Sequence, residues 1–264
     1  MRKFLPELKI VGAMLISKEG RDILDISIPN LMKWSDWVLL MLDNESKESK
    51  EIALYYQNTY PDKVVVEYTG LSRLTEDQEK ERSKGLLRRF KRLHGPIRQA
   101  IFDSLQNRIK KGEKVDILLF PDADEIFSNS LPELLEQFWA MPDKKAISMN
   151  WVTVFNDMKT IFKSNGGGHT RILKFAMDFT AIPHQKFSHY VPLTKEDRLG
   201  SRCVLIHLSQ LTKENREKRK DKWKFGIKGD EELCRLDKDV REMTPDKIKE
   251  VYRGEAHCFT RELL

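Results

Sequence analysis

Three carboxylates follow a short apolar run near the middle of the chain. The run is Ile117 to Phe120, and Asp122, Asp124 and Glu125 come directly after it. An apolar stretch of this length without alternation is typical of a strand that is buried on both faces of a sheet. Carboxylates this close together repel one another unless a cation lies between them, and hard oxygen ligands suit Mg2+ or Mn2+. The motif therefore predicts a divalent-metal site, with a solvated acidic turn as the alternative.

Strand-like and helix-like segments alternate before this motif. We expect strands at 9–17, 37–42 and 64–68 and helices at 21–33 and after Ser46, whose hydroxyl can cap its helix. Such alternation predicts βαβ units and an α/β fold of the doubly wound class, with a mostly parallel sheet flanked by helices. In open sheets of this kind ligands bind beyond the carboxyl ends of the strands, where the carboxylate motif is expected.

The remaining segments complete a single large domain with a C-terminal extension. Residues 70–95 are strongly charged and predict a long loop over one edge of the sheet. We divide the chain into a domain over 1–225, with halves at about 8–127 and 128–225, and a helical extension over 226–264. Further elements are expected as helices at 95–111, at 130–140 behind a capping box Ser130 to Glu133, from Thr212 and from Thr244, and as strands at 146–155, 171–175 and 203–208.

Composition favours a protein of the cytoplasm without a membrane span. The chain has 264 residues, of which 40% are hydrophobic and 33% charged, and no apolar run approaches the roughly 20 residues needed to cross a bilayer. The N-terminus lacks the apolar region of a signal peptide. Cys203, Cys234 and Cys258 lack the paired spacing of a zinc site or a disulfide framework, which fits a reducing compartment.

The net charge of +6 and the sequence pI of about 9.0 favour anionic partners. Lysine and arginine concentrate in 82–98 and 213–228. Most basic segments are solvated faces, but these two also suit phosphate contacts with a nucleic acid. Aromatic residues are sparse within them, being limited to Phe90, Trp223 and Phe225, so the nucleic-acid hypothesis stays an alternative.

The order of these features resembles the GT-A glycosyltransferases, in particular the family 2-like group that uses nucleotide-sugar donors. The resemblance covers roughly residues 8–225. The sequence lacks the Gln-X-X-Arg-Trp motif of processive synthases, and this difference favours transfer of a single sugar. Lys18 stands where that group more often has Asn. The matching residues each lie near an expected strand end or on the helix before the motif: Glu19, Asp43 with Ser46, Arg98, the Asp-X-Asp motif Asp122-Ala123-Asp124 followed by Glu125, and His207.

This resemblance implies roles for the matching residues. Asp122, Asp124 and His207 would hold Mn2+ or Mg2+, and Asp124 in particular would serve catalysis through the ion. The donor, with a UDP-sugar favoured, would be bound by Glu19, Asp43, Arg98 and Asp122. An inverting enzyme also needs a general base, for which Asp157 is the first candidate and Asp178 and Asp197 are alternatives. The acceptor hydroxyl could belong to a glycan, a small molecule or DNA.

Two other enzyme hypotheses use the same residues. A HAD-like phosphohydrolase would use Asp122 as its nucleophile, although the motif follows three earlier strands instead of opening the fold, and Ile126 replaces the usual Thr or Val. A DNA-directed glycosyltransferase would combine the metal motif with the basic segments. Steep dependence of activity on salt would favour the DNA-directed enzyme.

Overall fold

The computed structural model describes residues 4–17, 19–43, 46–69, 86–155, 160–162, 169–175, 193–194, 196–212 and 233–235. The chain divides into two compact units. The first unit consists of Met1–Ala123, Asp143–Ile147 and Thr170–Leu199. The second unit consists of Asp124–Pro142, Ser148–His169 and Gly200–Leu264. The boundary between them falls inside the Asp-X-Asp motif.

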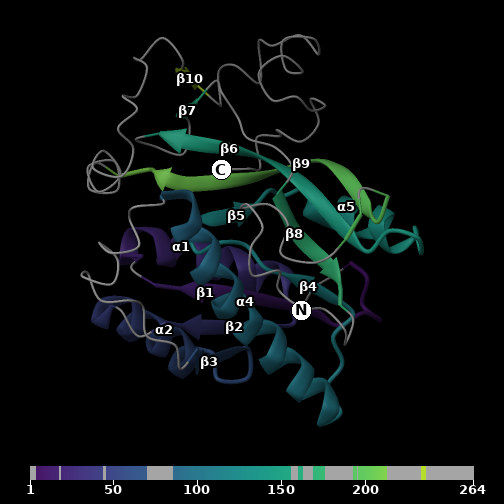
Figure 1. Ribbon diagram of the computed structural model, residues 1–264, viewed down its shortest axis with the longest axis horizontal. Coiled ribbons are helices and arrows are strands. Elements are labelled where there is room, and N and C mark those ends of the chain that lie inside the picture. Colours follow the sequence, from purple (N-terminus) through teal and green to yellow (C-terminus); the bar gives the residue numbers. More distant parts are fainter. Residues whose placement is uncertain are drawn as a thin grey trace. The chain divides into compact units, whose positions relative to one another are not determined.

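The first unit is built on a mostly parallel sheet (Figure 1). Its strands lie in the order β8-β4-β1-β2-β3, and β1 to β4 are parallel whereas β8 is antiparallel to β4. This arrangement confirms the predicted α/β class. The strands are β1 (Ile10–Ile16), β2 (Trp37–Leu42), β3 (Val64–Tyr68), β4 (Ile117–Leu119) and β8 (His169–Lys174), of which β8 enters the unit at Thr170.

Among the described residues of the first unit, three helices pack on this sheet: α1 (Arg21–Trp34), α2 (Lys47–Thr59) and α4 (Leu86–Lys110). Ser46 caps α2 as predicted, since its hydroxyl accepts a hydrogen bond from the Ser49 N–H at 3.2 Å. Helix α1 continues through Pro29. The side chain of Tyr56 on α2 donates to Asp25 on α1 at 3.1 Å, which joins these two helices.

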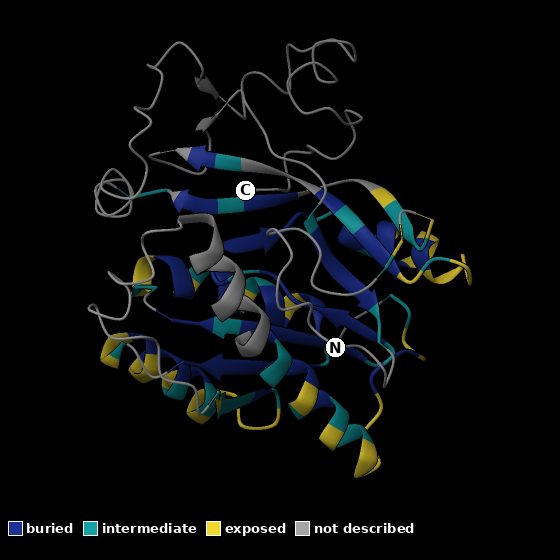
Figure 2. Cartoon of the chain, viewed as in Figure 1, coloured by how far each residue is buried: buried dark blue, intermediate teal, exposed yellow. Residues whose placement is uncertain are grey.

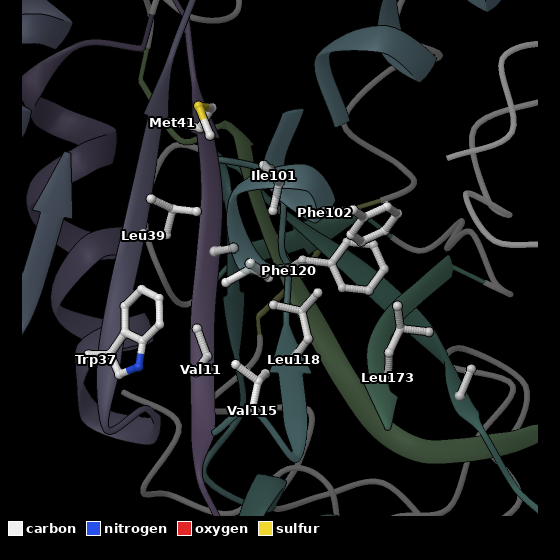
Figure 3. Close-up of a cluster of buried hydrophobic side chains, with 13 residues drawn as sticks. Val11, Trp37, Leu39, Met41, Ile101, Phe102, Val115, Leu118, Phe120 and Leu173 are labelled. Atoms are coloured by element: carbon white, nitrogen blue, oxygen red, sulfur yellow. The ribbon is translucent and has the colours of Figure 1, made fainter. Parts of the chain in front are cut away.

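Both faces of β1 are buried (Figure 2). Val11 and Ala13 belong to a core cluster that also contains Phe102 and Leu105 of α4 and Phe120 (Figure 3). Burial on both faces explains why the sequence of β1 is a continuous apolar run.

The opposite face of β1 meets α1. The Ser27 hydroxyl lies 3.9 Å from the sulfur of Met14. Gly12 is a position of close approach, since a Cβ atom there would lie 2.6 Å from Cγ of Leu31 and 2.7 Å from Oγ of Ser35. The absence of a side chain at residue 12 therefore allows α1 to pack directly on the strand.

The predicted loop over 70–95 is wrong for its last part, because α4 begins at Leu86 and runs through Gly95 and Pro96. Residues 70–85 lie outside the described residues. In the sequence, Leu86, Phe90 and Leu93 recur at spacings of three and four. Such spacing indicates a helix, and lysine and arginine between them are good helix formers. The density of basic charge concealed this pattern.

In the second unit the strands with a known register pair antiparallel: β5 with β9, β6 with β7 and β7 with β10. A smaller mixed region was expected on the acceptor side of the fold, and the pairs with a known register in this unit are all antiparallel. Strands β5, β7 and β10 were not expected. The strands are β5 (Glu125–Phe127), β6 (Ala146–Phe155), β7 (Thr160–Phe162), β9 (Arg198–Gln210) and β10 (Leu233–Arg235), of which β6 enters this unit at Ser148 and β9 at Gly200.

Helix α5 (Leu131–Trp139) of the second unit confirms the helix expected at 130–140. The capping-box prediction is wrong, because the Ser130 side chain makes no capping hydrogen bond and its hydroxyl instead lies 2.8 Å from that of Ser128. Apart from β10, the predicted C-terminal extension lies outside the described residues. The helix expected from Thr244 lies outside them too, and so does the helix expected from Thr212, except for Thr212 itself. No helix within the described ranges has the length and apolar character needed to span a bilayer.

Candidate functional site

Asp122 lies where the chain leaves β4, and it forms an isolated parallel bridge with Leu15 at the end of β1. Two guanidinium groups bind its carboxylate. Nη2 of Arg98 donates to Oδ1, and Nη2 of Arg171 donates to Oδ2 at 2.5 Å. Each oxygen of Asp122 therefore has its own arginine, and 36% of the Asp122 side chain stays exposed.

Both arginines are buried, and they come from different elements of the first unit. Arg98 lies on α4 and Arg171 lies on β8. A buried charge is costly unless it is paired and hydrogen-bonded, so these contacts account for two arginines inside the fold. The three side chains fix α4 and β8 to the chain segment that follows β4.

Sequence reasoning did not single out Arg171. It was placed at the start of an expected strand and given no role. The available signal was a charged residue between Thr170 and the apolar pair Ile172-Leu173, because arginine is rarely buried without a partner. The sequence did not indicate which carboxylate that partner would be.

Glu19 and Asp43 lie near the carboxyl ends of β1 and β2. Oε2 of Glu19 accepts a hydrogen bond from the Ser17 N–H at 2.7 Å, and its carbonyl accepts one from the Ser49 hydroxyl at 2.8 Å. Asp43 is buried, and its N–H donates to the carbonyl of Ile16 at 3.3 Å. Since β4, β1 and β2 are adjacent and parallel, Glu19, Asp43 and Asp122 follow neighbouring strands at one edge of the sheet.

Asp124 and His207 come together in the second unit. Nε2 of His207 lies 3.6 Å from Oδ2 of Asp124, and the carbonyl of Asp124 accepts the Leu208 N–H at 2.7 Å. Strand β9 places His207 opposite Glu125, the first residue of β5, which is buried. Pairing with β9 makes Glu125 part of a strand. Nδ1 of His207 is buried and has no hydrogen-bond partner among the described residues.

The donor chemistry at Asp124 and His207 suits Mn2+ or Mg2+, because these ions accept one or two protein carboxylates and complete their shell with water and phosphate oxygens. Within the described part of the chain, no group of three or more His, Cys, Asp or Glu side chains is placed to hold a metal ion. Asp122 belongs to the first unit, whereas Asp124 and His207 belong to the second. A shell shared by these residues therefore stays a prediction.

Of the three candidates for a general base, the structure describes Asp197. Asp157 and Asp178 lie outside the described residues. Asp197 accepts hydrogen bonds from the N–H and hydroxyl of Thr194 at 2.8 and 2.9 Å and pairs with Lys145 at 3.1 Å. The Thr194 hydrogen bonds, backbone first, and the Lys145 ammonium lower the pKa of Asp197 to about 2. So acidic a carboxyl is a weak base, which disfavours Asp197 for this role.

No protein-family model matches the chain, and no curated protein matches it. The chain is similar to several solved structures. Mannosyltransferase PcManGT from Pyrobaculum calidifontis, in complex with GDP-Man and Mn2+, matches with a TM-score of 0.42 and 9% identity over 95% of this chain and 69% of that chain. TarS from S. aureus matches with a TM-score of 0.45 and 10% identity over 76% of this chain and 37% of that chain.

A shorter form, S. aureus TarS 1-349 in complex with UDP-GlcNAc, matches with a TM-score of 0.38 and 12% identity over 56% of this chain. The match spans 35% of that TarS chain. The matches span between 35% and 52% of the TarS chains and 69% of the mannosyltransferase chain.

Proposed function

We propose that this protein is a metal-dependent glycosyltransferase that moves a single hexosyl or pentosyl group from a nucleotide-diphosphate sugar to an acceptor hydroxyl. The observation that supports it best is the edge of the first sheet. Glu19, Asp43 and Asp122 follow adjacent parallel strands there, and buried Arg98 and Arg171 bind the last of them. Nucleotides bind at this edge in open α/β sheets.

At this edge each group has a distinct task. Asp43 would accept hydrogen bonds from a ribose hydroxyl or the base, as acidic residues after strands do in nucleotide-binding folds. Glu19 would shape the end of β1 beside the nucleotide, since its carboxylate already orders the backbone at Ser17. Arg98 would add positive charge that stabilises the diphosphate as it leaves.

Asp124 and His207 would hold Mn2+ or Mg2+, with Asp122 as the third predicted ligand. When bound, the ion supplies the Lewis acid that neutralises charge on the departing nucleoside diphosphate. Asp157 is the proposed general base, because it follows the end of β6 at Phe155 by two residues. A UDP-sugar is the favoured donor, and a glycan, a small molecule or DNA is the proposed acceptor.

The phosphohydrolase alternative fits this geometry less well. It needs the Asp122 carboxylate as a free nucleophile, whereas each of its oxygens accepts a hydrogen bond from an arginine. Positive charge on both oxygens lowers the nucleophilicity of a carboxylate. The nucleic-acid alternative depends on basic segments that lie mostly outside the described residues.

A thermal-shift screen tests the proposal. The full chain is melted with UDP, GDP, CMP and their sugar conjugates, each with and without Mn2+. A ligand that binds the native state raises the melting temperature. At a concentration 100 times its Kd, the ligand stabilises the native state by about 2.7 kcal/mol. We expect one nucleotide class to stabilise the protein only when Mn2+ is present. If no nucleotide shifts the midpoint under either condition, the proposed donor site is wrong.

A further inference from the structure

Arg171 is the feature of the first unit that the proposed roles leave unexplained. Its side chain is fully buried, although arginine is among the residues least often found in a protein interior. Nη2 donates to Asp122 at 2.5 Å, and Nη1 lies 3.3 Å from the carbonyl of Thr170. An arginine that serves only packing would not need to aim its charge at a residue of the Asp-X-Asp motif.

The backbone of Arg171 fixes the same segment that its side chain fixes. Strand β8 pairs antiparallel with β4, with Ile172 opposite Leu119. The pairing extends one residue further, since the Phe120 N–H donates to the Arg171 carbonyl at 3.0 Å. Arg171 therefore holds the chain by its carbonyl at Phe120 and by its guanidinium at Asp122.

Two arginines hold Asp122 from two directions. Arg98 reaches Oδ1 from α4, and Arg171 reaches Oδ2 from β8. With a donor on each oxygen, the carboxylate plane cannot rotate without breaking a charge-assisted hydrogen bond. Because 36% of the Asp122 side chain is exposed, a ligand can reach the carboxylate. The arrangement presents Asp122 in one fixed orientation.

We propose that Arg171 is a positioning residue of the nucleotide-sugar site, acting through the Asp122 carboxylate. The role rests on the proposed function, because it matters only if Asp122 contacts the donor or its metal ion. Binding sites need their contact groups held within about 0.5 Å of the productive geometry. Residues that orient contact groups in metal sites typically contribute 10- to 100-fold to affinity or activity.

The test compares arginine variants of the full chain by titration calorimetry with UDP and GDP in the presence of Mn2+. For Arg171→Met, which keeps an unbranched apolar stem but removes the charge and donors, we expect the Kd of the bound nucleotide to rise about 10- to 100-fold. Arg171→Lys keeps the charge without the planar fork, so its Kd should lie between those of Arg171→Met and wild type.

Arg108→Met is the matched control. Arg108 lies on α4 and makes a similarly short ion pair, with Nη2 2.7 Å from Oε1 of Glu67, away from the motif. Its loss should lower the unfolding temperature but leave the nucleotide Kd unchanged.

The outcomes distinguish this role from the proposed function. Wild-type affinity in Arg171→Met, measured below its unfolding midpoint, would overturn the positioning role while the glycosyltransferase proposal stands. An equal loss of affinity in Arg108→Met would also overturn it, because the effect would then be one of general stability. If the wild-type chain binds no nucleotide with Mn2+ in the titration or in the thermal-shift screen, the donor site and the role of Arg171 both fall.

Discussion

The two aspartates of the Asp-X-Asp motif lie in different surroundings although one residue separates them. Asp122, in the first unit, is bonded by two buried arginines. Asp124, in the second unit, lies 3.6 Å from His207. Asp122 is thus held by fixed cations of the protein, whereas Asp124 adjoins an imidazole that can itself ligate a metal. The spacing of a motif shows where carboxylates lie, but the neighbours of each carboxylate decide its task.

Asp124→Asn should give the largest effect. The amide keeps the shape of the side chain but lacks the negative charge that attracts a divalent ion. We expect Mn2+-dependent turnover of the nucleotide sugar identified by the screen to fall by about 100-fold or more, with the unfolding temperature little changed. Measuring initial rates against Mn2+ concentration checks this.

Asp103→Asn is the control for that change, since Asp103 is exposed on α4 and accepts a hydrogen bond from Gln99 at 2.7 Å. It should retain wild-type turnover. Full activity in Asp124→Asn would break the contrast between the two aspartates and remove Asp124 from the metal site.

Gly12→Ala should have an intermediate effect and should act on the first unit. A Cβ atom at residue 12 would lie 2.6 Å from Leu31 and 2.7 Å from Ser35, so α1 has to move away from β1. Overpacking of this kind costs about 1–3 kcal/mol of the free energy of unfolding, which urea denaturation measures. Gly200→Ala in β9 is the control, because a Cβ atom there meets nothing within 4 Å. Equal losses in the two variants would contradict the proposed close approach.

Asp197→Asn should have the smallest effect, and it should depend on pH. Folding lowers the pKa of Asp197 from the ordinary 3.8 to about 2, chiefly through the Thr194 backbone hydrogen bond. A carboxyl with a lowered pKa stabilises the fold above its unfolded pKa, and this contribution disappears as the pH falls through the folded value. The variant should therefore unfold at a lower temperature than wild type at pH 6, and the difference should vanish toward pH 2. A difference that persists at pH 2 would show that another contact is responsible.

Strands were the most predictable part of this fold. The predicted ranges 37–42, 64–68 and 146–155 agree with β2, β3 and β6 at both ends. Strand β2 is buried along its whole length, so its sequence is an apolar run with clear limits, whereas β3 is only partly buried. The acidic residues at one sheet edge were also predictable, because each follows such a run in the sequence.

The rest depended on partners that are distant in the chain. Strand β5 has the short sequence Glu125-Ile-Phe127, and pairing with β9 is what makes it a strand. The contact between Arg171 and Asp122 joins residues 49 positions apart. No local pattern indicates either pairing. The start of α4 was a different kind of miss, since its apolar spacing was present but was obscured by basic residues.

The arginine pair on Asp122 also constrains how this sequence can change over evolution. Loss of Asp122 alone would leave two buried guanidinium groups without this counter-charge, and breaking a buried ion pair commonly costs about 3–5 kcal/mol. Loss of Arg171 alone would release one carboxylate oxygen and leave Arg98 to hold the other. The first aspartate of the motif and the arginine of β8 should therefore be inherited together, so that a lineage that abandons one will have replaced the other as well.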